Sequence, residues 1–427
     1  MSPYEENGNV LILGGGYAGL AAAYRLGRHG IPSTLIEAQP KVGGLAACST
    51  IDGVAVEHFY HHIKPEDGHV ISLIEELGLG YGLHWADTRM GFYIDGSFHP
   101  FSTPMDLLRF SPLSLMDRFR FAWGVFKAKR TEGKTLEGMN AEEWVVREWG
   151  RSVYERIMRP MLMNKFGIPP AWISAGFLQG RIKGLSSAKS SARGGEQLAY
   201  LRGSLQTLTD RLEEEIRNTC HIRVSTPIER IDTSPDGFHV HSGDEEFTAP
   251  FVVNTLPLTV FESIRKNFEF RTSIQYQAVA CGVFSIEEEL TPLYWINILD
   301  DDVTFRVFVN QSRMDEYSHP IVYCANYLRA DDPLFRRPDD EILDLYIGSM
   351  KKMFGRVTLR EGRLFRSRHA TPVFDRDFAA RTANLDDCVP GMVFAGNIKV
   401  YPYSRTVSSV IGTGFAAADR ILEGSRP

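Results

Sequence analysis

Three glycines near the start of the chain have the spacing of a turn that holds phosphate groups. Gly14, Gly16 and Gly19 follow the apolar run Val10–Leu13. Gly14 permits a sharp exit from a strand, and Gly16 has no Cβ, so the backbone can approach a pyrophosphate closely. Gly19 lets the next helix pack against the strand, and that helix offers its free amides and positive dipole end to the phosphates. The pattern predicts a nucleotide-binding strand–helix–strand unit.

An acid and a second glycine pair extend this motif. Glu37 lies 23 residues after Gly14, directly after the apolar run Ser33–Ile36. A carboxylate there can accept hydrogen bonds from an adenosine ribose and disfavours a 2′-phosphate, so NADP is the weaker candidate. Gly43 and Gly44 follow six residues past the acid, and NAD binding does not need them. The alternative, an ordinary strand–helix–strand unit without a nucleotide, fits this context less well.

A run of polar aromatic residues follows. Tyr60, His61 and His62 lie together, with His58 just before them. Imidazoles titrate near neutral pH, so the cluster could act as a proton shuttle. The alternative is a strand whose histidines are satisfied by their neighbours. No carboxylate or cysteine stands at a recognisable ligand spacing, so we expect no metal site.

Two basic residues further along could bind an anionic group. Arg405 lies in the segment Tyr401–Thr406, and Lys165 follows Asn164 shortly before Pro169. Either cation could neutralise a diphosphate or a carboxylate. The alternatives are an exposed loop around Arg405 and a structural turn around Lys165.

Composition narrows the class of protein. The chain has 427 residues, 43% hydrophobic and 23% charged, which is typical of a globular enzyme of two or three domains. The net charge of −6 gives no basis for nucleic-acid binding. The five cysteines are scattered and Met1–Asn7 is polar, unlike a signal peptide, so we expect a cytoplasmic protein. No apolar run has the length of a membrane span.

Three separated segments, near 1–65, 195–260 and 365–427, predict parts of one nucleotide-binding domain. The second segment contains a helix with Leu205, Leu208 and Leu212 at helical spacing, followed by short strands. The third contains an apolar strand before Gly396 and the small-residue helix Val407–Leu422. Segments 66–194 and 262–364 should then form the substrate domain, with a helical region around 101–165.

The segment Phe101–Arg130 interleaves large apolar residues with arginines and lysines. Apolar anchors with basic flanks are typical of a helix that lies on a membrane surface, so we expect peripheral membrane contact as one reading. The ordinary reading is a helical lid whose apolar face packs on the substrate domain.

The order of these motifs resembles the flavoprotein superfamily of amine oxidases, protoporphyrinogen oxidases and carotenoid desaturases, with features similar to UDP-galactopyranose mutases. The resemblance implies an α/β fold. A discontinuous Rossmann-like FAD-binding domain of the glutathione-reductase type would join an α+β substrate domain with a mixed sheet and a helical lid. It also implies that FAD contacts these residues: Gly14, Gly16, Tyr17, Ala18, Gly19, Glu37, Ala38, Gly43, Gly44, Leu45, Ala46, Ile228, Gly396, Asn397, Thr406 and Val407. The family usually has Arg where Leu45 stands, and an acid or Arg where Asn397 stands.

The resemblance also implies an activity. We expect an FAD-dependent oxidoreductase that moves a hydride from a small organic substrate to flavin N5, with oxygen or another acceptor reoxidising the flavin. Tyr60, His61, His62, Lys165 and Arg405 are the candidate catalytic residues. One alternative is a redox-neutral, mutase-like flavin enzyme that acts on a nucleotide sugar. Another is a non-catalytic carrier of prenyl lipid with the same fold.

Overall fold

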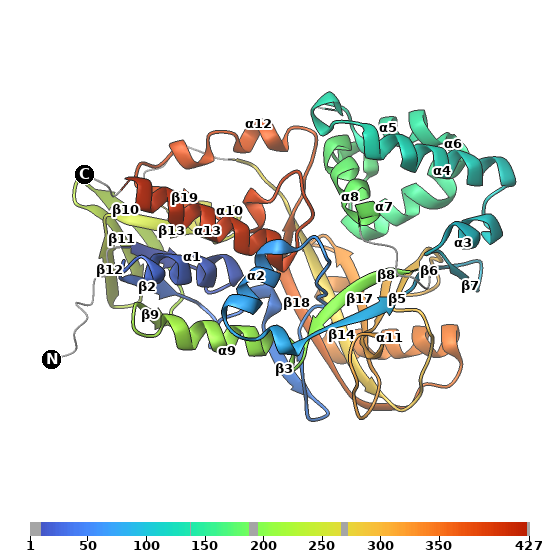
Figure 1. Cartoon of the computed structure of the whole chain (residues 1–427), viewed down its shortest axis with the longest axis horizontal. Helices are drawn as coiled ribbons and strands as arrows, with labels where there is room; N and C mark the ends of the chain where they lie inside the picture. Colours follow the sequence, from blue (N-terminus) through green and yellow to red (C-terminus); the bar gives the residue numbers. More distant parts are fainter. Residues whose placement is uncertain (1–9, 137, 188–194, 266–271, 425–427) are drawn as a thin grey trace.

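The computed structural model describes residues 10–136, 138–187, 195–265 and 272–424. The polar segment Met1–Asn7 lies outside these ranges. The described chain is a mixed α/β fold that contains a parallel sheet and a larger mixed sheet (Figure 1).

The parallel sheet contains the predicted N-terminal strand, and all four residues of that strand, β1, are buried. Apolar runs of this kind form strands that are covered on both faces. Helices α1 (Tyr17–Arg28), α9 (Ser204–Ile216) and α13 (Val407–Gly424) supply much of the apolar core beside it, with α2 (Gly68–Glu76) next to α13. The strands lie in the order β19 (Met392–Phe394), β13 (Phe251–Asn254), β1 (Val10–Leu13), β2 (Ser33–Ile36) and β9 (Cys220–Arg223).

The mixed sheet lies beside the first layer and carries α11 (Asp339–Phe354) on one face, through Ile342, Tyr346 and Met350. Its neighbouring strands are antiparallel except for one parallel pair, β15 with β6. The order is β18 (Leu359–Pro372), β14 (Tyr276–Ile286), β17 (Ile321–Leu328), β16 (Val307–Asn310), β15 (Trp295–Ile298), β6 (Met90–Ile94) and β7 (Ser97–Pro100).

Shorter elements complete the two layers. The small antiparallel sheets are β10 (Arg230–Ser234) with β11 (Gly237–Ser242) and β12 (Glu245–Ala249), β3 (Cys48–Ile51) with β4 (Val54–Glu57), and β5 (Leu83–Thr88) with β8 (Glu196–Leu201). Two short helices are α10 (Leu258–Ile264) and α12 (Phe378–Thr382).

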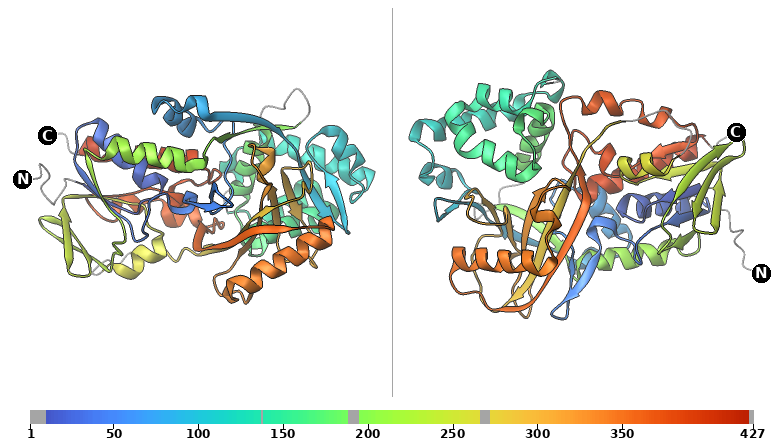
Figure 2. Two further views of the ribbon diagram at one scale, coloured as in Figure 1. Left: turned by 90° about the horizontal axis from the view of Figure 1, so that it is seen from below. Right: turned by 180° about the vertical axis from the view of Figure 1, so that it is seen from behind.

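A group of helices stands at one end of the molecule, away from the parallel sheet (Figures 1 and 2). A π-helical turn, 154–158, joins two of them, α6 and α7. The helices are α3 (Pro104–Arg109), α4 (Leu115–Arg130), α5 (Ala141–Trp149), α6 (Arg151–Val153), α7 (Arg159–Phe166) and α8 (Ala175–Ser187).

Helix α4 packs Phe121 and Val125 partly against the core but leaves five large apolar residues exposed, which the ordinary reading of a lid did not predict. Its buried residues are Asp117, Gly124 and Ala128, which share one narrow face. A Cβ on Gly124 would lie 2.4 Å from the Trp149 ring, so this face approaches α5 very closely. The exposed side instead carries Leu115, Met116, Phe119, Trp123 and Phe126. Helical spacing places these five on one face, opposite the buried stripe.

Candidate functional site

The glycine turn leads from β1 into α1 as the sequence predicts. Gly14 has a φ of 102°, which favours glycine, and its amide donates to Ile36 O at 2.8 Å. Helix α1 begins at Tyr17 with no side-chain cap and no acid in its first turn. Its first amides are therefore available to an anionic ligand.

Gly15 and Gly16 of the turn lie beside Gly43 and Gly44. Gly43 donates its amide to Gly15 O at 2.8 Å. A Cβ built on Gly16 would meet nothing nearer than Gly44 Cα at 3.9 Å, whereas a Cβ on Gly19 would lie 2.1 Å from Gly14 O. Gly16 thus leaves open room beside free amides, and Gly19 is required by packing. This open room fits a phosphate group.

Glu37 closes the turn on one side. Its Oε2 accepts from the Gly15 amide at 2.7 Å, and its Oε1 accepts from the Gln39 amide at 2.8 Å. Each carboxylate oxygen can accept a second hydrogen bond, so ribose hydroxyls could still bind. In the neighbouring loops Ala38 is exposed, Leu45 is half-buried and Ala46 is buried.

The Tyr17 side chain points into the protein. It is buried, and its hydroxyl donates to Leu205 O at 2.9 Å and lies 2.9 Å from Thr209 Oγ1. The side chain therefore joins α1 to α9. Only the backbone of Tyr17 remains to face a ligand.

The C-terminal segment returns to the same turn. A Cβ on Gly396 would lie 3.8 Å from the Ala18 Cβ, and one on Gly414 of α13 would lie 2.2 Å from Ala18 O. The Gly396 amide donates to Thr413 Oγ1 at 2.8 Å. The residues after β19 and the helix α13 are thus both held against the start of α1.

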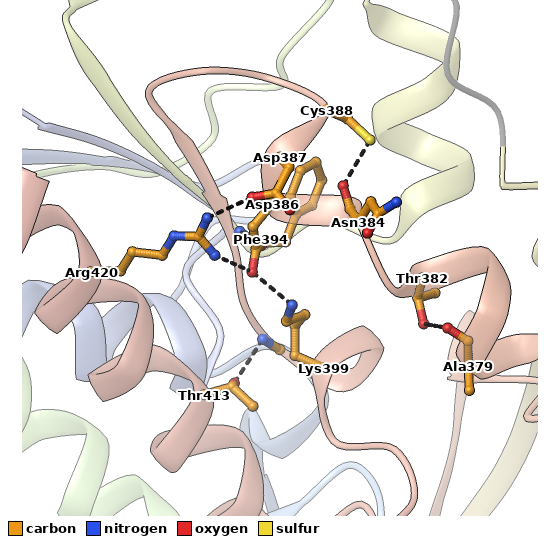
Figure 3. A network of polar contacts seen from close by, with 11 residues as sticks. Ala379, Thr382, Asn384, Asp386, Asp387, Cys388, Phe394, Lys399, Thr413 and Arg420 are labelled. Atoms are coloured by element: carbon orange, nitrogen blue, oxygen red, sulfur yellow. Dashed lines mark hydrogen bonds and ion pairs between the residues drawn. The ribbon is translucent and has the colours of Figure 1, made fainter.

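A polar network holds the C-terminal segment around Gly396 in place (Figure 3). Asp386 accepts from Lys399 Nζ at 2.7 Å, from Arg420 Nη1 at 3.0 Å and from the Phe394 amide at 3.0 Å. Because Asp386 lies before β19 and Arg420 lies in α13, the carboxylate connects the segments on both sides of Gly396. Asn397, which follows it, is half-buried, and its amide group lies 3.5 Å from Ala370 O.

Thr406 caps the start of α13. Its hydroxyl accepts from the Ser409 amide at 3.1 Å and donates to Asp67 Oδ1 at 2.9 Å. Val407 is the first residue of the helix. Burial raises the pKa of the Asp67 carboxyl. Ile228 lies in the connection between β9 and β10, where it is half-buried against the core.

Burial lowers the pKa of all three histidines of the cluster, that of His58 to about 4. His58 stacks on Phe365 at 4.1 Å and lies 2.8 Å from Ser49 Oγ. Burial lowers the pKa of His61 to about 4, with the charge of Arg405 adding to it, and its Nδ1 is buried without a hydrogen-bond partner among the described residues. Burial lowers the pKa of His62 to about 3. Both rings are neutral at pH 7, and their pKa values lie below the range that the sequence suggested.

An aromatic group surrounds Lys165. The hydroxyls of Tyr60 and Tyr327 lie 2.6 Å apart, and the Tyr60 ring meets the Trp295 ring edge-on at 4.9 Å. Lys165 Nζ lies 5.1 Å from the centre of the Trp295 ring and 5.0 Å from that of Tyr327. His62 lies beside this group, with its Nδ1 3.1 Å from the Tyr294 hydroxyl. The structure therefore gathers three predicted residues, Tyr60, His62 and Lys165.

Sequence reasoning missed Tyr327, Trp295 and Arg181. The first two lie in strands β17 and β15, and no sequence pattern indicates that their side chains face Lys165. The Asn164 side chain already has a hydrogen-bond partner within the protein, since its amide group donates to Ile298 O at 2.7 Å. Arg405 donates to Ala370 O, the carbonyl that Asn397 also approaches.

Two kinds of feature are absent from the described ranges. They contain no group of three or more His, Cys, Asp or Glu side chains arranged to hold a metal ion. They also contain no helix with the length and apolar character needed to cross a bilayer.

Similar proteins agree with this arrangement. A protoporphyrinogen oxidase of Nicotiana tabacum is 23% identical over 300 residues, covering 60% of this chain and 59% of that protein. The chain spans about two fifths to three fifths of the length of the curated relatives it matches. A putative protoporphyrinogen oxidase of Exiguobacterium has the same fold at a TM-score of 0.79 and 18% identity, covering 97% of this chain and 98% of that one. A reduced UDP-galactopyranose mutase also reaches 0.79 at 15% identity, covering 98% and 94%.

The family model described as flavin-containing amine oxidoreductase matches residues 17–422. The match begins at the first residue of α1, directly after the glycine turn, and ends within α13, so it includes Glu37, Gly43, Gly44 and Gly396. This chain belongs to the family of flavin-containing amine oxidoreductases.

Proposed function

We propose that this chain binds FAD and oxidises an organic substrate by passing a hydride to the flavin. The family supports a flavin, and the open room at Gly16, beside the uncapped start of α1, is the observation that carries the proposal. When bound, the flavin would supply the redox chemistry, and the protein positions substrate and tunes charge.

The glycine turn would hold the pyrophosphate of FAD. The amides at the start of α1 would bind its oxygens, and Gly43 and Gly44 would form the opposite wall. The Glu37 carboxylate would accept hydrogen bonds from the ribose hydroxyls. Gly396, Asn397, Thr406 and Val407 would lie toward the ring, because α13 presents its amide end there and that end favours negative charge.

The aromatic and histidine cluster would line the substrate side. Tyr60, Trp295 and Tyr327 supply apolar faces that exclude water from the reacting carbon. His61 and His62 are neutral at pH 7 and so act as hydrogen-bond partners rather than as cations. Domain bounds of 1–65, 195–260 and 365–427 for FAD, and of 66–194 and 262–364 for substrate, remain part of this proposal.

A redox-neutral, mutase-like reaction is the second candidate. The cations Lys165, Arg181 and Arg405 favour it, because a sugar diphosphate needs positive charge. Anaerobic mixing separates the two. An oxidoreductase substrate bleaches the flavin absorbance near its visible maximum in one turnover. A mutase substrate leaves oxidised flavin unchanged and turns over only on enzyme reduced beforehand by dithionite. If no amine, ring compound or sugar nucleotide does either, both candidates fail.

We also propose that α3 and α4 contact an anionic lipid surface. Leu115 is 75% exposed, Phe119 68% and Trp123 48%, on the face opposite the buried stripe. Exposed basic residues flank this face: Arg109, Arg120, Lys127, Lys129 and Arg130. Apolar insertion combined with basic flanks matches a negatively charged membrane surface.

A further inference from the structure

Three cations converge beside the aromatic group from three separate elements. Lys165 lies in the last turn of α7, Arg181 lies in α8 and Arg405 lies in the loop before α13. Helix α8 packs directly on that loop, since a Cβ on Gly180 would lie 2.7 Å from Pro402 O. Ser174 Oγ, just before α8, lies 3.1 Å from the Tyr401 hydroxyl in the same loop. The fold thus packs the segments that carry Arg181 and Arg405 against each other, and the two cations interact electrostatically.

No carboxylate balances these charges within the described part of the chain. Lys165 contacts aromatic rings, and Arg405 donates to a backbone carbonyl. The charged groups that face Lys165 are Arg181, Arg405 and Lys64, all of the same sign. The nearby acids Asp67 and Glu196 face Lys64 instead.

Such a cluster is unfavourable without a negative ligand. Burial, followed by the neighbouring cations, holds the pKa of the Lys165 ammonium well below its ordinary value. Burial likewise lowers the pKa of Arg181, with Arg405 adding to this against opposing effects of Tyr327 and Tyr60. The aromatic faces of Trp295 and Tyr327 stabilise one cation. These aromatic faces do not explain why Arg181 and Arg405 also lie near Lys165.

We propose that the substrate carries an oxyanion, a carboxylate or a phosphate ester, which Lys165, Arg181 and Arg405 bind. This rests on the proposed function, because it places the anionic end of the substrate beside the flavin-facing cluster. A protonated amine would meet three like charges here, so simple amines are poor substrates of this site. The anion fixes the substrate orientation, and the aromatic group receives its apolar part.

Three probes that share one ring test the charge. Phenyl phosphate, benzoate and benzylamine are titrated into the FAD-loaded protein by calorimetry at low salt. We expect at least one anion to bind about tenfold or more tightly than benzylamine. The tighter anion identifies the class, phosphate ester or carboxylate. Equal or tighter binding of benzylamine, or no binding of either anion, would overturn the inference.

Variants connect that binding to the cluster. Lys165→Met and Arg181→Met should each weaken the preferred anion about tenfold or more, and Lys165→Arg and Arg181→Lys should restore most of the affinity. Arg159→Met removes one exposed charge from the same helix as Lys165 and should bind like the parent. Met variants that fold, by circular dichroism, and bind the anion normally would contradict the proposal.

A separate measurement distinguishes the two proposals. FAD content is counted and flavin reduction by dithionite is followed in every variant. If the parent protein contains no FAD, the proposed function fails. If it contains FAD and binds no anion, only this inference fails.

Discussion

Gly16 and Gly19 lie three residues apart, yet their missing side chains have opposite consequences. The sequence predicted both positions from spacing alone. The structure separates them, because a Cβ would find open room at Gly16 and backbone at Gly19.

Gly19→Ala should destabilise the fold. The added methyl would lie 2.1 Å from Gly14 O, so strand and helix must separate, at a cost of about 1–3 kcal/mol. Urea unfolding measures the loss. Gly348→Ala is the control, since a Cβ there meets nothing within 4 Å. Equal stability of the two variants would mean that α1 does not approach the turn this closely.

The protonation of the histidines could not be predicted from the sequence. Their identity suggested titration near neutral pH, but burial lowers the pKa values of His61 and His62. The surroundings of His62 include residues far away in the sequence, since the Tyr294 hydroxyl, 232 positions away, lies 3.1 Å from its Nδ1. Sequence spacing carries no information about it.

Glu57 gives a pH prediction. It is fully buried, accepts from the Leu205 amide at 2.8 Å and from the Tyr200 hydroxyl at 2.7 Å, and burial raises its pKa above 4.5. The folded chain therefore holds this proton more tightly than the unfolded chain. Stability is lost as pH rises from about 4.5 through the folded pKa. Each tenfold difference in proton affinity between the folded and unfolded chains corresponds to about 1.4 kcal/mol of that loss.

Glu57→Gln removes this loss and keeps both hydrogen-bond partners, since the amide can accept from Leu205 and donate to Tyr200. As the pH rises from 5 to 8, we expect the parent to lose more stability than the Glu57→Gln variant. Tm values of both proteins at the two pH values test it. A parallel decline in both would show that Glu57 is not the group responsible.

At the scale of elements, apolar patterning predicted several elements around the parallel sheet. Leu205, Leu208 and Leu212 lie in α9, and Val407–Leu422 falls within α13. Periodicity failed for α4, where large apolar residues predict a buried face. A stripe of Asp117, Gly124 and Ala128 is buried instead, because only small contacts fit against Trp149.

The exposed face of α4 makes a prediction about membranes. Phe119→Glu combined with Trp123→Glu should reduce sedimentation with vesicles of anionic phospholipid at least about tenfold, since each change replaces an apolar anchor with a like charge. Tyr81→Glu, at a site 88% exposed on another element, is the control. Unchanged binding of the double variant, or no binding by the parent, would remove lipid as the partner.

At the scale of the molecule, three distant segments converge on one turn. The order of motifs in the sequence predicted these segments but did not predict which strands pair between them. β8, from the second segment, pairs with β5. β18 crosses the predicted start of the third segment at residue 365 and pairs with β14 in the mixed sheet. Boundaries between segments follow tertiary pairing, and no local signal in a strand identifies its partner. The domain division therefore stays a prediction.

The FAD content of Gly16→Val tests the central claim most directly. A Cβ on Gly16 would come no nearer than 3.9 Å to Gly44 Cα, so we expect the fold to survive while the valine side chain excludes FAD. Gly348→Val makes the same substitution where nothing is bound. After heat release, we expect about one FAD per chain in the parent and in Gly348→Val, and less than a tenth of that in Gly16→Val at unchanged circular dichroism. Normal FAD content in Gly16→Val would show that the pyrophosphate does not lie at the glycine turn.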